Sequence, residues 1–505
     1  MKITIARFGM VGLLTMFCSV NASAEPIGQF SDHVDIGAVK HSGSVVYDAA
    51  GQKYKISGSG KNMWVGEDQL HYAYNQISGD FIVSAQVAFE GKGVDPHRKV
   101  GWNVRTSLDT ASPNINAALH GDGLTSLQFR EKSGGDTDQY PLQIKAPDVI
   151  QLERRGDVYI FSAAKKGEPF QVTSVSHIKL GDKVYVGLAM CSHNADVVEA
   201  ATFSNVRITI PVAKDFKPYK DYIGSNLEIL DLNTGNSRIV FRSPDSIQAP
   251  NWTLDGKSLI YNSNGLLYNF DLASEKPTVI NTGFAKYNNN DHVLSWDGKQ
   301  IGISSHVKAD NNNSTLYTLP LKGSDKPVQI NATGAGHSYL HGFSPDDKKL
   351  IFTGQRNNSF NIFTIDLKTR KETQLTSTRS PSLDDGAEYS PDGKYIYFNS
   401  NRTGLMQLWR MLADGSNQEQ LTFDNHNNWF PHVSPDGKKI VFLSYMTDID
   451  PNEHPFYRHV YLREMPIDGG EATIIAYVYG GQGTINVPSW SPDGSKIAFV
   501  SNTQM

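Results

Sequence analysis

Short runs of alternating apolar and polar residues recur from Gln29 to about Pro211, and no stretch of this half keeps a sustained apolar period of 3.6 residues. Such alternation places successive side chains on opposite faces of an extended strand. The first-half segments with this pattern are residues 81–89, 99–105, 124–130, 149–154, 158–162 and 184–190. The pattern therefore predicts an all-β protein built from short strands and tight turns.

One turn motif recurs six times in the second half of the chain. Its copies are Thr253-Leu-Asp-Gly, Ser295-Trp-Asp-Gly, Ser344-Pro-Asp-Asp, Ser390-Pro-Asp-Gly, Ser434-Pro-Asp-Gly and Ser491-Pro-Asp-Gly. In this motif Pro presets φ, Asp bonds the local backbone and Gly accepts a positive φ, so each copy is a tight turn that leads into a strand. A repeat of about 40 to 50 residues with four short strands is typical of one blade of a β-propeller.

The order of the repeats predicts how the propeller closes. A second repeated element, a pair of outer strands, occurs first at Leu227, before the first turn motif. The last turn motif, at Ser491, is followed by a single short apolar run at residues 496–500. Six inner and six outer pairs make six blades, with the sixth built from both ends of the propeller segment. This closure leaves no free sheet edge.

The repeats also resemble a known family. The Ser-Pro-Asp-Gly-Lys turns, the stretch Phe398-Asn-Ser-Asn-Arg402-Thr-Gly and the outer pair that ends in Gln420-Leu-Thr are similar to the propeller repeats of the TolB family, over about residues 220–505. The resemblance implies a TolB-like six-bladed propeller and, by way of TolB itself, a periplasmic protein scaffold. Residues 25–210 do not resemble the small α/β domain that TolB joins to its propeller.

A second resemblance concerns the first half of the chain. Gly79-Asp-Phe, the segment 100–109, His120-Gly-Asp-Gly123 and a closing Phe203-Ser-Asn-Val-Arg207 follow one another as in a group of concanavalin-like sandwich domains of carbohydrate-active bacterial proteins. The resemblance implies a jelly-roll sandwich with sugar affinity, and an accessory or structural role is the alternative. The candidate binding residues of this domain are Arg105, His120, Asp122 and Arg130.

The N-terminus has the pattern of a secretory signal. Lys2 and Arg7 precede an apolar stretch, and Ala22-Ser23-Ala24 supplies small residues for cleavage. The stretch is shorter than the roughly 20 residues of a membrane-spanning helix. We therefore expect a signal peptide at residues 1–24, no transmembrane segment after its removal, and a periplasmic or secreted protein. The expected mature organisation is a concanavalin-like sandwich at 25–212, a linker at 213–224 and the propeller at 225–505.

Composition narrows the range of partners. Of the 505 residues, 52 are acidic and 47 are basic, which gives a formal net charge of −5. A mildly acidic chain without basic clusters lacks the positive surface that attracts nucleic acid or an anionic membrane, so neither is expected as a partner. After signal cleavage Cys191 would be the single cysteine, so no internal disulfide is expected.

Polar residues concentrate where each blade enters its innermost strand. Because the innermost strands of a propeller line its central channel, we expect these residues to form a binding funnel. An insertion at residues 445–458 in the fifth blade adds a further candidate. The funnel candidates are His292, His337, His341, Asp384, Asp385, Glu388, His426, Trp429, His432 and His454.

Two chemistries fit such a funnel. An exposed Trp429 could pack against a sugar ring while Asn, Asp and His side chains bond its hydroxyls, and carbohydrate or polymer recognition is the leading interpretation. Alternatively, imidazoles could hold a divalent transition metal, with His292, His341, His426 and His432 as candidate ligands. Oligogalacturonate lyases, which carry similar repeats, use a His-rich metal site, so a metal-assisted oligosaccharide lyase or hydrolase is the second interpretation. A scaffold for a periplasmic protein is the third, and no catalytic residue is assigned.

Overall fold

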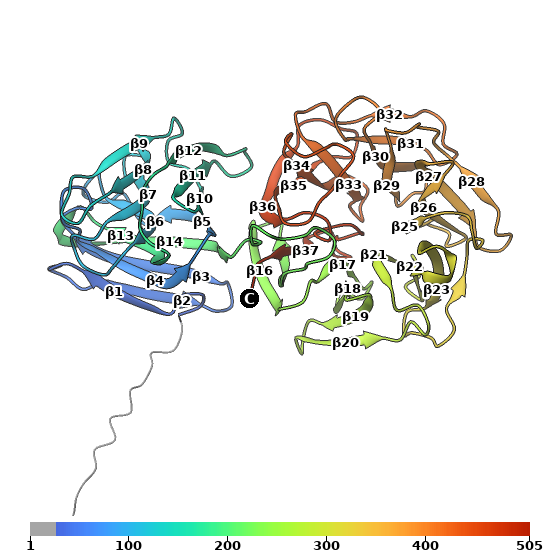
Figure 1. Ribbon diagram of the computed structural model, residues 1–505, viewed down its shortest axis with the longest axis horizontal. Coiled ribbons are helices and arrows are strands. Elements are labelled where there is room, and N and C mark those ends of the chain that lie inside the picture. Colours follow the sequence, from blue (N-terminus) through green and yellow to red (C-terminus); the bar gives the residue numbers. More distant parts are fainter. Residues whose placement is uncertain (1–26) are drawn as a thin grey trace, which may run out of the picture.

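The computed structural model describes residues 27–505, so the expected signal peptide lies outside the described residues. Figure 1 shows a β-rich N-terminal part beside a ring of small sheets. Within the described residues the helical content is one short 3-10 turn at Lys308–Asp310, which confirms the all-β prediction. No helix in this range has the length and apolar character needed to cross a membrane.

The N-terminal part consists of two seven-stranded antiparallel sheets. The first has the order β1 (Asp32–Ile36), β4 (Leu70–Ser78), β13 (Lys183–Cys191), β6 (Lys99–Arg105), β7 (Asn114–His120), β8 (Thr125–Arg130) and β9 (Asp138–Pro141). The second has the order β12 (Gln171–Val175), β11 (Val158–Ala164), β10 (Val149–Arg155), β5 (Phe81–Phe89), β14 (Asn194–Thr209), β3 (Lys53–Gly60) and β2 (Ser44–Asp48).

Five four-stranded sheets follow, each numbered from the centre outward (Figure 1). They are β17 (Gln248–Trp252), β18 (Ser258–Ser263), β19 (Leu266–Asp271) and β20 (Lys276–Ile280); β21 (Asn288–Leu294), β22 (Gln300–Val307), β23 (Asn313–Pro320) and β24 (Val328–Gln329); β25 (Ser338–Phe343), β26 (Lys349–Arg356), β27 (Ser359–Asp366) and β28 (Glu372–Gln374); β29 (Asp384–Tyr389), β30 (Tyr395–Ser400), β31 (Gln407–Leu412) and β32 (Glu419–Gln420); and β33 (Asn427–Val433), β34 (Lys439–Tyr445), β35 (Arg458–Pro466) and β36 (Thr473–Gly480).

The sixth blade joins the two ends of the propeller. Strand β15 (Ser225–Asp231) lies between β16 (Asn236–Ser243) and β37 (Lys496–Asn502), and a bridge between Trp490 and Ile497 stands in for the innermost strand. The six-bladed propeller and its predicted closure are therefore confirmed.

The turn motifs form as their chemistry predicts. In all six copies the Ser or Thr hydroxyl donates to the Asp carboxylate two residues later, over 2.6 to 2.8 Å. The fourth residue requires a left-handed backbone, with a φ of 69° at Gly437. In the third copy Asp347 adopts a φ of 55°, and its carboxylate accepts hydrogen bonds from the backbone N–H groups of Trp296 and Asp297. That exception links the turns of two neighbouring blades.

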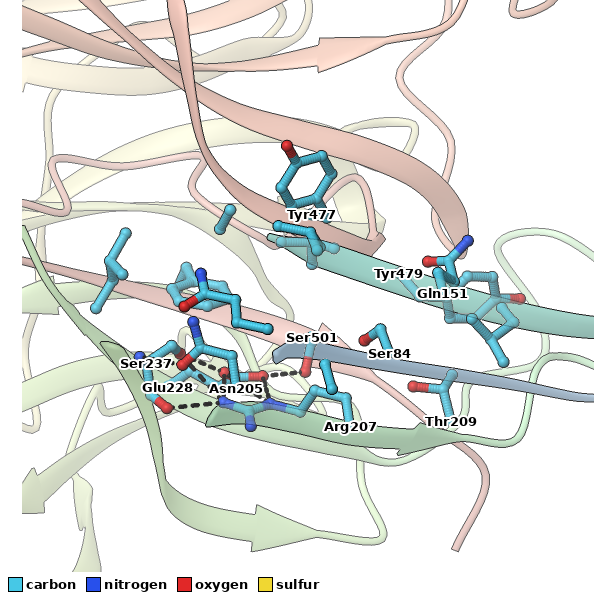
Figure 2. A pocket seen from close by; sticks show the side chains of 18 of the residues that line it. Ser84, Gln151, Asn205, Arg207, Thr209, Glu228, Ser237, Tyr477, Tyr479 and Ser501 are labelled. Carbon is cyan, nitrogen blue, oxygen red and sulfur yellow. Dashed lines mark hydrogen bonds and ion pairs between the residues drawn. The ribbon is translucent and has the colours of Figure 1, made fainter. Parts of the chain in front are cut away.

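A buried ion pair joins the N-terminal part to the closing blade (Figure 2). Arg207 on β14 donates to the carboxylate of Glu228 on β15, with the shortest nitrogen–oxygen distance at 2.5 Å. The hydroxyls of Ser237 on β16 and Ser501 on β37 donate to the same carboxylate, at 2.6 and 2.5 Å. Glu228 therefore ties together three strands of the closing blade and one strand of the N-terminal part.

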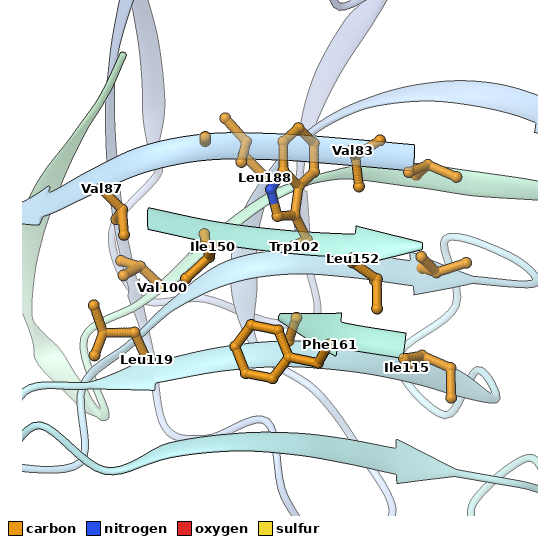
Figure 3. Packing of buried hydrophobic residues seen from close by; sticks show 14 of the residues in the cluster. Val83, Val87, Val100, Trp102, Ile115, Leu119, Ile150, Leu152, Phe161 and Leu188 are labelled. Atoms are coloured by element: carbon orange, nitrogen blue, oxygen red, sulfur yellow. The ribbon is translucent and has the colours of Figure 1, made fainter. Parts of the chain in front are cut away.

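The core of the N-terminal part lies between its two sheets (Figure 3). Trp102 from β6 and Phe161 from β11 are both completely buried there. Their neighbours along each strand point to the opposite face, which the alternating pattern requires. Burial of each large apolar side chain stabilises the fold by about 1.5 to 3 kcal/mol.

Candidate functional site

A cavity of about 380 Å³ lies against the innermost strands of the propeller. Strands β21, β25, β29 and β33 each contribute side chains to it, and the insertion between β34 and β35 adds His454. Of the predicted funnel residues, the structure brings His341, Asp385, Trp429 and His454 together at this cavity.

His341 and Asp385 form an ion pair in the cavity wall. The Nε2 atom of His341 lies 2.9 Å from Oδ1 of Asp385, which also accepts a hydrogen bond from the Thr353 hydroxyl at 2.6 Å. Burial alone would lower the pKa of His341, but the hydrogen bond and charge of Asp385 raise it. Burial alone would raise the pKa of Asp385, but His341 and the Thr353 hydroxyl hold it at about 2. The pair therefore favours a proton on His341 beside an ionised Asp385.

Asp291 is the second carboxyl group of the cavity. It is 6% exposed, and its side chain accepts no hydrogen bond from any residue in the described range. Burial raises the pKa of Asp291 to about 7, with a smaller opposing effect of His341 and a reinforcing effect of Asp385. The two carboxyl groups of the cavity therefore have opposite pKa shifts, because one has an imidazole within hydrogen-bond distance and the other does not.

Trp429 does not offer the exposed ring that was expected. Its side chain is completely buried, with the imidazole of His454 packed edge-on at 4.5 Å between ring centroids. Phe430, the next residue, has a φ of 55° at a β-bulge between Trp429 and His432. The partly exposed aromatic surface of the cavity comes instead from Tyr339, Phe360 and the linker residue Tyr219.

The remaining funnel candidates point elsewhere. His292 lies 3.3 Å from the carbonyl of Ile260, and Asp384 pairs with Arg402 at 2.8 Å. His337, at the rim, accepts a hydrogen bond from the backbone N–H of Ser314. Other candidates have separate partners: Glu388 lies 2.6 Å from His432, and His426 lies 3.5 Å from Asp424.

The backbone explains why the predicted funnel residues do not share one site. A register shift interrupts the first strand pair of the blades that begin with β21, β25, β29 and β33. In β25, β29 and β33 the shift is one residue, which turns the following side chains to the other face of the strand, and in β21 it is two residues. Residues that are close in sequence therefore leave the strand on different sides.

The metal hypothesis is not supported by this geometry. His292, His341, His426 and His432 bond to four different partners, and residues 27–505 contain no group of three or more His, Cys, Asp or Glu side chains arranged to hold a metal ion. The structure therefore gives these four imidazoles separate partners, and a metal site built from them stays a prediction.

The predicted binding residues of the sandwich separate into two groups. Arg105 and Arg130 are completely buried, and their guanidinium groups lie 3.4 and 2.7 Å from the Asp68 carboxylate. They anchor the loop at residues 61–69 rather than face a ligand. His120 and Asp122 lie at the other end of β7, where burial lowers the pKa of His120 to about 3 and Asp122 bonds the backbone of its own turn.

A row of amides crosses the same sheet. Asn103 is aligned with Asn116, Asn116 with Gln128 and Gln128 with Gln139 on four adjacent strands. Both amide atoms of Asn103 and the Oδ1 atom of Asn116 are buried without a hydrogen-bond partner in the described part of the chain. Buried amides normally find partners, so this row is a buried polar strip with unused bonding capacity that becomes partly exposed at Gln139.

Sequence reasoning did not select several residues of the cavity. Asp291 adjoins His292, yet its side chain faces the cavity while that of His292 does not. Tyr219, in the expected linker, and Gln482, after β36, reach the cavity through the tertiary fold alone. The sequence did contain a signal that could have identified Asp291 as a cavity residue, because it lies in the polar run before a turn motif.

Comparison with known proteins identifies relatives of about half of the chain. A family model described as the TolB beta propeller domain matches residues 291–455. An uncharacterized protein of Agrobacterium fabrum is 43% identical over 277 residues, which cover 55% of this chain and 92% of that protein. The Tol-Pal system protein TolB of Francisella tularensis subsp. tularensis is 28% identical over 297 residues, 57% of this chain. The chain spans 62% of the length of that TolB.

A solved structure agrees with these matches. The structure of an Agrobacterium tumefaciens protein provisionally called TolB has 42% sequence identity and a TM-score of 0.52. The match covers 56% of this chain and 100% of that chain.

Proposed function

Because this chain belongs to the TolB-like β-propeller family, we propose that it is an exported periplasmic binding protein whose funnel recognises a carbohydrate or a related polyhydroxylated polymer. The cavity at the innermost strands is the principal binding site. The mature protein is expected to carry this propeller behind a concanavalin-like sandwich that acts as a second binding module.

The combination of side chains in the cavity supports this proposal. Tyr339 and Phe360 offer partly exposed rings for the apolar face of a pyranose. Around them, Asn290, Gln482 and His454 each have a buried polar atom without a partner in the described residues. Sites of this kind bury a ligand against aromatic surface and orient it with a few polar groups.

Removal of the aromatic surface tests the proposal. Tyr339→Ala and Phe360→Ala should each weaken binding of cellotriose about tenfold, as expected for the loss of roughly 1.4 kcal/mol of ring contact. Isothermal titration calorimetry measures the change. Phe423→Ala is the matched control, because this ring is 78% exposed and does not line the cavity. Equal affinity of all three variants and the wild type would contradict the proposal.

The amide row of the sandwich is the second candidate site within this proposal. The unpartnered amide of Asn103 favours a ligand with several hydroxyl groups. Asn103→Leu should abolish cellotriose binding to the sandwich and leave binding to the propeller unchanged, which two-site calorimetry resolves. A single set of sites in the wild type, unaffected by Asn103→Leu, would contradict this second site.

A periplasmic protein partner is the alternative function. The identity with a Tol-Pal system protein favours it. In that case pull-down from periplasmic extract should succeed equally with the wild type and with Tyr339→Ala, because the partner would dock outside the funnel.

A further inference from the structure

The cavity has an unbalanced charge. Its two carboxyl groups are Asp291 and Asp385, its imidazoles are His306, His341 and His454, and no Lys or Arg from the described residues lines it. His341 compensates Asp385 through the 2.9 Å contact. His454 lies 3.9 Å from the other oxygen of Asp385, whereas Asp291 forms no ion pair within residues 27–505, so this carboxyl group lacks a cationic partner.

The position of Asp291 makes this lack costly. A carboxylate that is 94% buried without a partner loses its hydration and gains nothing in return, and Asp291 is 6% exposed. The titratable groups that share the cavity with it are Tyr219, His306, Tyr339, His341, Asp385 and His454. Of these, His341, Asp385 and Tyr339 interact with Asp291 electrostatically. His341 is already bonded to Asp385, and the Tyr339 phenol is neutral because burial raises its pKa. No side chain of the described residues donates a hydrogen bond to the Asp291 carboxylate, and no cationic side chain bonds to it.

The aromatic lining suits a cation as well as a sugar. Tyr339, Phe360 and Phe430 contribute rings to the same cavity, and ring faces attract ammonium groups once water is excluded. A ligand with an ammonium group would therefore find both a carboxylate and ring faces. On the basis of the proposed function, we propose that the funnel selects amino sugars, with the ammonium group bonded to Asp291.

Three trisaccharides with the same β-1,4 backbone test this inference. They are cellotriose, the glucosamine trimer and the N-acetylglucosamine trimer, measured by calorimetry at neutral pH. The glucosamine trimer should bind about tenfold or more tightly than cellotriose, as expected for a charge-assisted hydrogen bond. The N-acetylated trimer should bind no better than cellotriose, because acetylation removes the charge.

Asp291→Asn should reduce the preference for the glucosamine trimer to about one, while cellotriose binding changes little. Glu471→Gln is the charge-matched control, since Glu471 is exposed and makes no ion pair within residues 27–505. Unchanged thermal unfolding of both variants shows that the fold is intact, and Asp291→Ser replaces the Asn variant if that variant unfolds.

The outcomes separate the two proposals. Equal binding of all three trimers, or a preference that persists in Asp291→Asn, overturns the amino-sugar inference and leaves the proposed function intact. Trilysine that binds as tightly as the glucosamine trimer also overturns it, because the ammonium group alone would then suffice. No binding of any trimer at concentrations of about 10 mM, far weaker than a specific site, overturns both proposals.

Discussion

The ion pair between Arg207 and Glu228 offers the sharpest test of how the sandwich and propeller are held together. Glu228 is buried, with a side chain that is 2% exposed, and Arg207 is its cationic partner. In Arg207→Ala, the carboxylate would keep the hydroxyl donors Ser237 and Ser501 but lose its countercharge. Removal of one member of a buried pair costs about 3 to 5 kcal/mol, because the other charge is left uncompensated.

Urea unfolding followed by fluorescence and circular dichroism measures this cost. Each transition should be fitted separately, since a chain with two structural parts need not unfold in one step. Arg410→Ala is the control: its partners Glu419 and Asp468 are 53% and 79% exposed, so at most about 1 kcal/mol should be lost. The double variant Arg207→Leu with Glu228→Leu should lose less than Arg207→Ala, because no unpaired charge stays buried.

The pH dependence of the pair has a definite sign. Burial alone would raise the pKa of Glu228, but the charge and hydrogen bonds of Arg207 and the two serine hydroxyls lower it. A carboxyl group whose pKa is lowered by folding stabilises the fold at pH values above its unfolded pKa of about 4.3. This stabilisation is lost as the pH falls from there through the lower pKa of the folded state. The free energy of unfolding of the wild type should therefore fall toward that of the double variant as the pH is lowered into the acid range. A loss in Arg207→Ala no larger than in Arg410→Ala would refute the reasoning.

Three further outcomes are expected. Gly437→Ala should cost about 1 kcal/mol in urea unfolding because its φ is 69°, whereas Gly437→Asn should cost less, since Asn tolerates this conformation; equal costs would contradict the turn argument. Deletion of β37 should leave β15 as an open edge and cause aggregation in size-exclusion chromatography, and a monomeric, folded product would contradict the closure argument. Binding of the glucosamine trimer near pH 7 should release protons from Asp291, because a bonded ammonium group lowers the raised pKa of this carboxyl group. The calorimetric heat should then differ between phosphate and Tris buffers but not in Asp291→Asn, and buffer-independent heats would contradict it.

The fold was predictable to the level of blades because its signals are local. Each turn motif is specified by a few adjacent residues, such as Ser434 and Asp436, whose side chains bond one another over 2.7 Å. Their spacing sets the number of blades, and their order relative to the outer strands predicts the shared blade of β15 and β37. Period-2 alternation likewise identifies strands such as β5 and β6 in the first half.

The candidate site was predictable only in part. The polar runs before the turns do contain His341 and Asp385, which meet across two blades. The same runs contain His292 and His432, which the bulges of β21 and β33 direct to other partners. A bulge depends on how the strand packs against its neighbours, and spacing along the chain does not reveal it.

The sequence by itself thus determined the strands, the turns, the number of blades and their closure, because these depend on contacts between near neighbours in the chain or on a recurring motif. The tertiary structure decided which polar side chains share a cavity. In the folded chain Arg105 is buried beside Asp68, and the imidazole of His454 packs against Trp429. The Asp291 carboxyl group accepts no hydrogen bond from the described residues. Burial and charge balance arise from residues far apart in the chain, so they exist only once the blades have closed around a common centre.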